Sequence, residues 1–183
     1  MSEFEKAMRG EVFFRGDETL ALLRDKARDL CFDYNQLRPS QLKERKVLLK
    51  ELMGSVKENY TILSPFQCDY GKFIEVGENF FANMDLKILD GGKVKFGDDV
   101  MIGPNCTFIT VNHMIDPQER LAGMQVFKDI EVGNNVWFGA GVMVLPGVKI
   151  GDNSVIAAGS LVTKDIEANV LAMGSPCKAV RKI

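Results

Sequence analysis

The feature that most constrains the fold is a six-residue period in the C-terminal half of this 183-residue chain. An apolar residue recurs every six positions without a slip, at Val132, Phe138, Val144, Ile150, Ile156 and Val162. Small or β-branched residues follow four positions after the first five of these, at Val136, Val142, Val148, Ser154 and Ser160. The pattern also appears earlier, around Phe96 and Ile102. Such a period fits neither an amphipathic helix nor a hairpin. It is typical of a solenoid in which each short strand contributes one inward side chain.

Tight corners are predicted between these strands. Each candidate corner holds Gly with Asn or Asp within the next two positions, at residues 77–79, 97–99, 133–135 and 151–153. These residue types tolerate the left-handed backbone conformations that tight corners need. The alternative is a β-sandwich with regularly spaced turns, but its strands recur irregularly at about 8–12 residues. The constant period therefore favours the solenoid.

Before residue 60 the spacing of apolar residues is helical. Asp17 is a candidate N-cap for a helix whose apolar residues recur at three and four positions up to Tyr34. Pro39 ends this helix, Ser40 is the predicted cap of a second one, and Gly54 suits its end. We therefore predict an N-terminal helical cap at residues 1–60. The β-helix domain is expected at 61–183, with a C-terminal tail.

The six-residue period is interrupted at residues 112–128, which contain Pro117 and Gly123. A solenoid accommodates such an interruption as a loop extruded from one coil, and protruding loops on rigid scaffolds tend to carry function. His113, the only histidine of the chain, lies at the base of this loop. A neutral imidazole can accept a proton from a hydroxyl group near physiological pH. The alternative is a surface or packed histidine without a catalytic task.

The composition excludes several function classes. The 23 Lys and Arg against 25 Asp and Glu give a net charge of -2, which does not favour a nucleic-acid or polybasic membrane partner. No apolar run approaches the length of a membrane span, and the N-terminus lacks the layout of a signal peptide, so we expect a cytoplasmic protein. The four cysteines contain no CxxC pair. Reduced, mostly buried thiols are therefore expected in place of a disulfide framework or a zinc site.

Several longer motifs occur together in this chain. They are Cys68-Asp69-Tyr70-Gly71, Asn79-Phe80-Phe81-Ala82-Asn83, Ile88-Leu89-Asp90, Asn112-His113, Gly133-Asn134-Asn135-Val136-Trp137, residues 146–151, residues 158–165 and Gly174-Ser175-Pro176-Cys177-Lys178. With these motifs the chain resembles the galactoside/maltose O-acetyltransferases of the hexapeptide-repeat superfamily over nearly its whole length. The resemblance implies a left-handed parallel β-helix with an N-terminal helical cap. It also implies a homotrimer with active sites between subunits, and acetyl transfer from acetyl-CoA to a hydroxyl group.

The resemblance assigns roles to individual residues. It implies that His113 is the general base and that Asn83 lies beside the acetyl group and the acceptor. Asp69 corresponds to a position that contacts the acceptor, although a solvated turn acid is nearly as good an interpretation. Coenzyme A is expected along the outside of the C-terminal coils, in contact with Ala140, Ala158, Thr163, Lys164, Lys178 and Arg181. Trp137 either lines this channel or packs as a buried aromatic. The hydroxyl is expected to attack the thioester directly in a ternary complex, with no catalytic metal and no acetyl-enzyme.

The acceptor side departs from the galactoside pattern. Arg15 stands where the galactoside enzymes place an acid, Gly91 stands where a second acid can follow Asp90, and Phe81 replaces a possible tyrosine. Another sugar, or a xenobiotic such as an antibiotic, therefore remains open as the acceptor. A carbonic anhydrase of the zinc type needs three histidines per metal and is excluded by the single histidine. The presence of His113, Asn83 and a basic tail argues against a non-catalytic scaffold.

Overall fold

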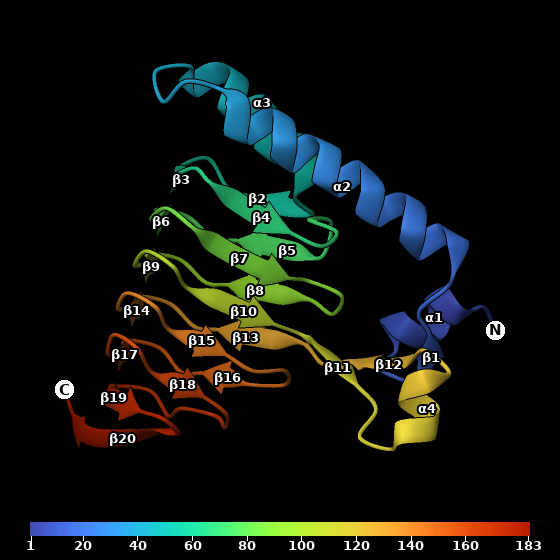
Figure 1. Cartoon of the computed structure of the whole chain (residues 1–183). Coiled ribbons are helices and arrows are strands. Elements are labelled where there is room, and N and C mark those ends of the chain that lie inside the picture. Colours follow the sequence, from blue (N-terminus) through green and yellow to red (C-terminus); the bar gives the residue numbers. More distant parts are fainter.

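Short parallel strands stack into a solenoid with three faces in the computed structural model, which describes all 183 residues (Figure 1). Sheet I contains β3 (Tyr60–Ile62), β6 (Phe80–Ala82), β9 (Met101–Ile102), β14 (Trp137–Phe138), β17 (Val155–Ile156), β19 (Val170–Gly174) and β20 (Cys177–Lys182). Sheet II contains β4 (Phe66–Cys68), β7 (Leu86–Leu89), β10 (Thr107–Ile109), β15 (Met143–Val144) and β18 (Leu161–Val162). Sheet III contains β2 (Ser55–Val56), β5 (Ile74–Val76), β8 (Val94–Phe96), β13 (Ile130–Val132) and β16 (Lys149–Ile150). The chain visits sheets III, I and II in that order in every coil, so the solenoid has an I/II edge, a II/III edge and a III/I edge.

The interior of the solenoid is filled by the residues of the six-residue period. Every residue of the two series that begin at Val132 and Val136 is buried, which confirms the predicted inward positions. Four phenylalanines form a column along the axis, with neighbouring ring centroids 5.0 to 5.2 Å apart: Phe80, Phe96, Phe108 and Phe138. Coils stack so closely that a Cβ on Gly139 would lie 2.5 Å from the backbone nitrogen of Ala158. Glycine in the repeat is thus a requirement of coil stacking.

The predicted corners lie at the III/I edge. Asn79, Asp99, Asn135 and Asn153 all have φ between 53° and 59°, in the left-handed region. Their side chains bond from coil to coil, as between Asn135 Nδ2 and Asn153 Oδ1 at 3.0 Å. The prediction of left-handed Asn and Asp corners is therefore confirmed.

The second of the two predicted N-terminal helices differs from the prediction at both of its ends. Helix α2 (Glu18–Gln36) begins as predicted, since the Asp17 carboxylate accepts the N–H of Leu20 at 3.0 Å. Helix α3 (Leu42–Leu52) has Gln41 at its N-cap with no side-chain bond, so the predicted Ser40 cap is wrong. The reason is a turn at residues 38–41, closed by the N–H of Gln41 on the carbonyl of Arg38, which delays the helix start. Gly54 is not a left-handed cap either; a Cβ there would lie 2.1 Å from the Lys72 carbonyl oxygen.

Helix α2 is joined to the first coil by hydrogen bonds that complete the open end of the solenoid. Asn35 Nδ2 donates to the carbonyl of Phe66 at 2.9 Å, and the N–H of Phe66 donates back to Asn35 Oδ1 at 2.9 Å. The Tyr34 hydroxyl donates to the carbonyl of Ile62 and accepts from buried Arg45 at 2.8 Å. The helical region therefore covers apolar residues that would otherwise face water.

A second small sheet joins the N-terminus to the interruption in the period. Strand β1 (Phe13–Phe14) pairs antiparallel with β12 (Met124–Phe127), which pairs with β11 (Val111–His113). Helix α1 (Glu3–Met8) and helix α4 (Pro117–Leu121) flank this sheet, away from the solenoid (Figure 1). Phe13 and Phe127 pack with ring centroids 4.6 Å apart in a small core of their own. None of the helices is both long enough and apolar enough to traverse a bilayer.

Candidate active site

His113 ends strand β11 and is exposed. In the small sheet it stands directly opposite Gln125, which stands opposite Phe13 on β1. Gln125 Nε2 lies 3.4 Å from Nδ1 and 3.5 Å from Nε2 of the imidazole. Both distances exceed the range of a good hydrogen bond. The two ring nitrogens therefore have no strong partner in the chain, and one can accept a proton from a substrate.

Two of the departures on the acceptor side contact the β12 segment, which pairs with the strand of His113. Arg15 follows β1 directly, and its side chain lies near Gly123, the residue before β12. The N–H of Arg15 donates to the carbonyl of Gly123 at 3.0 Å. A Cβ on Gly91 would lie 2.2 Å from the ring of Phe127, so this chain cannot hold an acid at position 91 without moving that ring. Position 15 thus carries a positive charge, and position 91 no charge, where the galactoside pattern expects acids.

A separate group of predicted residues lies at the I/II edge. Asn83, Ala140 and Ala158 all lie at corners of this edge, and the corner of Gly103 stands between those of Asn83 and Ala140. The corners of Ala140 and Ala158 are neighbours, joined by the bond from Gly159 N to the Ala140 carbonyl at 2.8 Å. Asn83 Oδ1 accepts the N–H of Met84 at 2.8 Å, which leaves its NH₂ group without a partner in the chain. The N–H groups of Ala140 and Ala158 also make no hydrogen bond within the chain. This edge therefore offers donors on a surface of small side chains.

The chain does not bring Asn83 and His113 together. Asn83 lies between β6 and β7, at the I/II edge, whereas His113 lies beyond β10, at the II/III edge. The whole width of sheet II separates the two edges, as Figure 1 shows. A site that uses both residues needs the I/II edge of one chain and the II/III edge of another.

Asp69 lines a cavity of about 420 Å³ between helix α2 and sheet II. Burial raises the pKa of its carboxyl group, and the positive charges of Arg24 and Arg28 oppose that rise. Its N–H donates to the fully buried carboxylate of Asp90 at 3.0 Å. The sequence pattern does not reveal that Asp90 organises the turn that carries Asp69, because this role depends on its burial and on bonds to residues about 20 positions away.

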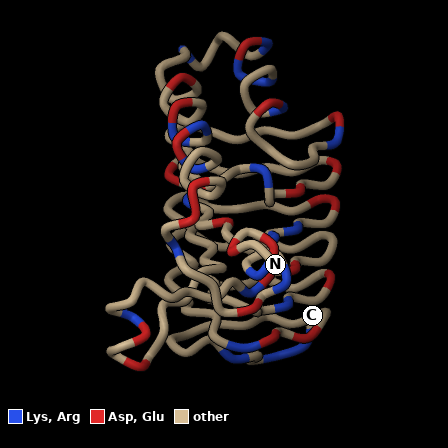
Figure 2. The backbone as a smooth tube through the Cα atoms, turned by 90° about the vertical axis from the view of Figure 1, so that its right-hand side faces the viewer, with Lys and Arg blue, Asp and Glu red and all other residues tan.

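The remaining predicted residues lie toward the C-terminal end of the solenoid and are exposed. Thr163 and Lys164 follow β18 at the II/III edge. Lys178 and Arg181 lie on β20, opposite Met173 and Leu171 of β19. Figure 2 shows Lys and Arg gathered at this end. These positions suit contacts with phosphate groups, although they do not all lie on one edge of the chain.

Sheet I carries an apolar column on its outer surface. Phe81, Met101 and Trp137 stand side by side on neighbouring strands β6, β9 and β14. Trp137 is 51% exposed and Met101 is 49% exposed. The interpretation of Trp137 as a buried aromatic is therefore wrong, because its side chain points outward while Phe138 fills the interior.

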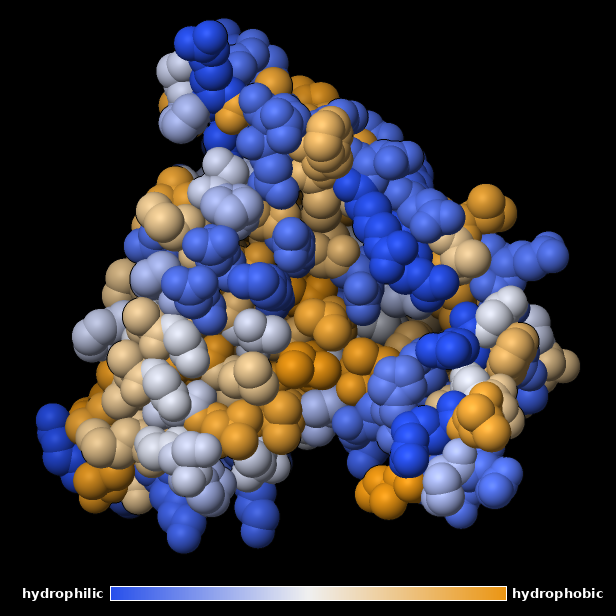
Figure 3. Space-filling model, in the orientation of Figure 1, coloured by the Kyte–Doolittle hydropathy of each residue, from blue (hydrophilic) through white to orange (hydrophobic).

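The front surface of the molecule is hollowed between the solenoid and the extruded residues, and apolar side chains lie on its floor (Figure 3). The extruded segment itself presents apolar residues to solvent. Ile115 is 94% exposed and Leu121 is 84% exposed. Apolar side chains exposed on a protruding segment favour contact with another protein surface.

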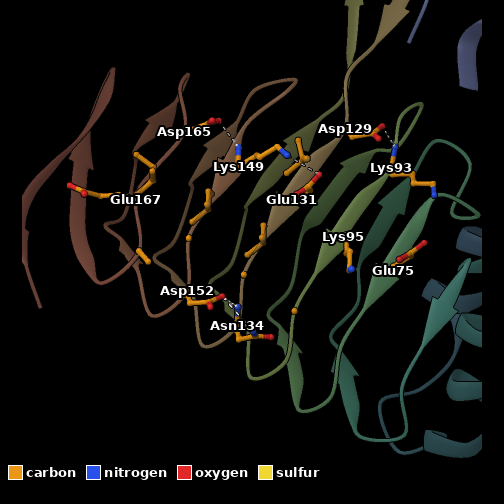
Figure 4. A pocket seen from close by; sticks show the side chains of 18 residues that line it. Glu75, Lys93, Lys95, Asp129, Glu131, Asn134, Lys149, Asp152, Asp165 and Glu167 are labelled. Atoms are coloured by element: carbon orange, nitrogen blue, oxygen red, sulfur yellow. Dashed lines mark hydrogen bonds and ion pairs between the residues drawn. The ribbon is translucent and has the colours of Figure 1, made fainter. Parts of the chain in front are cut away.

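The largest depression lies elsewhere, on the outer surface of sheet III (Figure 4). Charged side chains of alternating sign line it, and Lys149 pairs with Glu131 at 3.2 Å. Asp129, Asp152 and Asp165 accept backbone N–H groups of neighbouring coils. None of the predicted site residues lines this depression, and its carboxylates serve coil stacking.

Comparisons with known proteins identify relatives of the same fold over nearly the whole chain. The maltose acetyltransferase hexapeptide capping motif matches residues 6–57, and the bacterial transferase hexapeptide (six repeats) matches residues 129–164. The galactoside O-acetyltransferase of Escherichia coli is 41% identical over 98% of this chain and 88% of its own. A maltose O-acetyltransferase structure from Clostridium difficile is 42% identical with a TM-score of 0.99, covering 100% of this chain and 98% of that one. A galactoside acetyltransferase in complex with coenzyme A is 41% identical with a TM-score of 0.96, covering 100% and 92%.

Proposed function

The chain belongs to the galactoside/maltose O-acetyltransferase family of hexapeptide-repeat enzymes, and we propose that it moves an acetyl group from acetyl-CoA to a hydroxyl of a sugar or sugar-like acceptor. As a member of this family it is an acetyl-CoA-dependent acyltransferase. The observation that carries the proposal is the position of the only imidazole. His113 is exposed at the end of β11, at the base of the extruded segment, and its ring nitrogens have no strong partner.

His113 acts as the general base in this proposal. A ring nitrogen takes the proton of the acceptor hydroxyl while the oxygen attacks the thioester carbonyl supplied by acetyl-CoA. The NH₂ group of Asn83 orients the hydroxyl or the acetyl group, since only its carbonyl is engaged in the chain. The N–H near Ala140 stabilises negative charge on the carbonyl oxygen. Direct attack in a ternary complex needs no cysteine nucleophile and forms no acetyl-enzyme.

The I/II edge fits the pantetheine arm of coenzyme A. Ala140 and Ala158 present small side chains there, and a Cβ on Gly141 or Gly159 would meet nothing within 4 Å. An extended chain can lie close to such a surface and bond to free N–H groups. Lys178 and Arg181 would meet phosphate groups beyond the last coil, and Thr163 and Lys164 come from the II/III edge.

In the proposed homotrimer, the I/II edge of one subunit lies against the II/III edge of the next. This contact would bring Asn83 on the first edge toward His113 on the second. Support comes from the apolar column of sheet I and from the exposed Ile115 and Leu121, which a neighbouring copy would cover. Three equivalent sites then form between three subunits.

The acceptor is set by the surroundings of His113. Asp69 can bind hydroxyl groups from the first coil, while Arg15 and Gly91 remove the acids of the galactoside pattern. We therefore propose that the acceptor is a hydroxylated compound other than an unmodified galactoside or maltose. Its location in the cytoplasm stays a prediction.

The experiment follows thiol release from acetyl-CoA with a panel of sugars, sugar derivatives and hydroxylated drugs. We expect turnover with at least one acceptor. His113→Ala should lower kcat/KM by about 10²- to 10⁴-fold, as loss of a general base does. Binding of coenzyme A, measured by calorimetry, should be unchanged.

Glu119→Gln, in the same extruded segment, is the matched control and should retain activity. Unchanged turnover in His113→Ala would remove the imidazole from the mechanism. Absence of both turnover and coenzyme A binding in the native protein would favour the non-catalytic scaffold.

A further inference from the structure

Two of the four cysteines face each other across the junction between the helical cap and the solenoid. Cys31 on α2 and Cys68 at the end of β4 are 37 residues apart in sequence, yet their sulfur atoms lie 3.6 Å apart. Cys106 and Cys177 face no other thiol. Cys106 donates to the carbonyl of Gly139 at 3.2 Å instead. The acetyl transfer proposed above uses none of these thiols.

We propose that Cys31 and Cys68 form a redox-active dithiol, which hydrogen peroxide converts to a disulfide that ties helix α2 to the first coil of the solenoid. A disulfide has an S–S length of about 2.05 Å, so the sulfurs need to approach by roughly 1.5 Å. Rotation about two Cα–Cβ bonds and a small shift of the helix can provide this. The proposal concerns these thiols alone and does not depend on the transfer reaction.

A small oxidant can reach the pair. Both cysteines line the cavity of about 420 Å³ between α2 and sheet II. Arg28, Lys87 and Asp69 line the same cavity, so its wall holds two cationic groups and one acid. Cationic groups near a thiol favour its reactive thiolate form.

Either thiol can donate in the contact between the two sulfur atoms. With Cys68 as the donor, the bond lowers the pKa of Cys31, whereas the same bond and burial raise the pKa of Cys68 well above its usual range. Asp90 opposes ionisation of both groups, and Asp69 opposes that of Cys68. Cys31 is therefore the attacking thiol and Cys68 the resolving one.

The chemistry balances with one peroxide per pair. The Cys31 thiolate attacks an oxygen of hydrogen peroxide, so that the O–O bond breaks, a sulfenic acid forms and hydroxide leaves as water after protonation. Cys68 loses its proton and attacks the Cys31 sulfur, which forms the S–S bond and releases a second water. The two thiols lose two electrons and peroxide gains them.

The test treats the reduced full-length protein with hydrogen peroxide and then alkylates the remaining thiols under denaturing conditions. We expect two of the four thiols to be lost, and the intact mass to fall by two hydrogen atoms per chain. A peptide map without reductant should show Cys31 linked to Cys68. The thermal midpoint of the oxidised protein should be several degrees higher, because the cross-link constrains the unfolded chain. A dithiol reductant should reverse both changes.

Matched variants separate this pair from the other thiols. Cys106→Ser and Cys177→Ser should still form the bond, and Cys31→Ser and Cys68→Ser should not. Circular dichroism of each variant checks the fold. Survival of all four thiols would overturn the proposal, as would a cross-link between two chains or oxidation to sulfinic acid without a disulfide.

Discussion

At the scale of single residues, the buried carboxylate of Asp90 is the most unusual group in the structure. It is completely shielded from solvent, and its two oxygens accept the N–H groups of Asp69, Tyr70 and Phe73. Burial raises its pKa to about 7, although hydrogen bonds from backbone N–H groups, that of Tyr70 foremost, oppose the rise. Asp90 therefore holds the turn that carries Asp69. Keeping its ionised form buried lowers the stability of the fold by an amount that depends on pH.

This shift predicts how stability changes with pH. The unfolded carboxyl releases its proton near pH 4, but the folded one does so only near pH 7. Between these values the folded state binds more protons, so its contribution to stability falls as pH rises, by on the order of 4 kcal/mol at most. Urea unfolding at pH 5 and pH 7 measures the fall. The fall in stability between pH 5 and pH 7 should be smaller in Asp90→Asn and unchanged in the exposed control Asp29→Asn.

At the scale of secondary structure elements, helix α2 supplies hydrogen bonds to the first coil that a neighbouring strand would otherwise supply. Asn35 offers one donor and one acceptor to the backbone of Phe66, as a neighbouring strand would. Phe66 is completely buried, so its N–H and carbonyl groups have no access to water. The amide side chain thus completes the hydrogen bonding of the first coil, where no earlier coil exists.

Replacement of Asn35 by Ala should therefore destabilise the protein by about 2 kcal/mol or more. The loss leaves a donor and an acceptor of buried Phe66 unsatisfied, and each costs about 1–3 kcal/mol. Denaturant unfolding at a fixed protein concentration measures the change. The neighbouring exposed Gln36→Ala is the control, and an equal effect in both variants would contradict this role of Asn35.

At the scale of the whole molecule, the three-sided solenoid separates the two groups that the proposed mechanism needs. Asn83 lies at the I/II edge and His113 at the II/III edge, with sheet II between them. The outer column of Phe81, Met101 and Trp137 also leaves apolar surface without a cover in one chain. Self-association would bury this surface and bring one edge of each subunit to the other edge of the next.

This arrangement predicts complementation between two inactive variants. His113→Ala and Asn83→Ala, unfolded together in equal amounts and refolded, should regain activity that neither shows alone. In random trimers about a quarter of the sites would combine an intact His113 with an intact Asn83 from the neighbouring subunit. Each variant refolded alone is the control. No recovery in mixtures that sediment as trimers would place both groups within one chain's site.

The amino-acid sequence by itself determined the solenoid, its inward residues and its corners. These features repeat locally, so that an apolar residue every six positions and Asn or Asp at each corner are sufficient to predict them. The sequence also indicated His113 as a candidate functional residue, since it is the only histidine and lies beside the interruption of the six-residue period. The cap of α2 at Asp17 was predictable for the same reason, because capping involves neighbouring residues.

Only the tertiary structure decided the contacts between distant segments. The bond of Asn35 to Phe66, the approach of Cys31 to Cys68 and the pairing of β1 with β12 join residues that no local period relates. The small sheet depends on packing of Phe13 against Phe127, 114 positions apart in the printed sequence. Such contacts form because apolar and hydrogen-bonding groups of separate segments are buried together. Their geometry exists only once the coils have stacked and the helical cap has docked on the first of them.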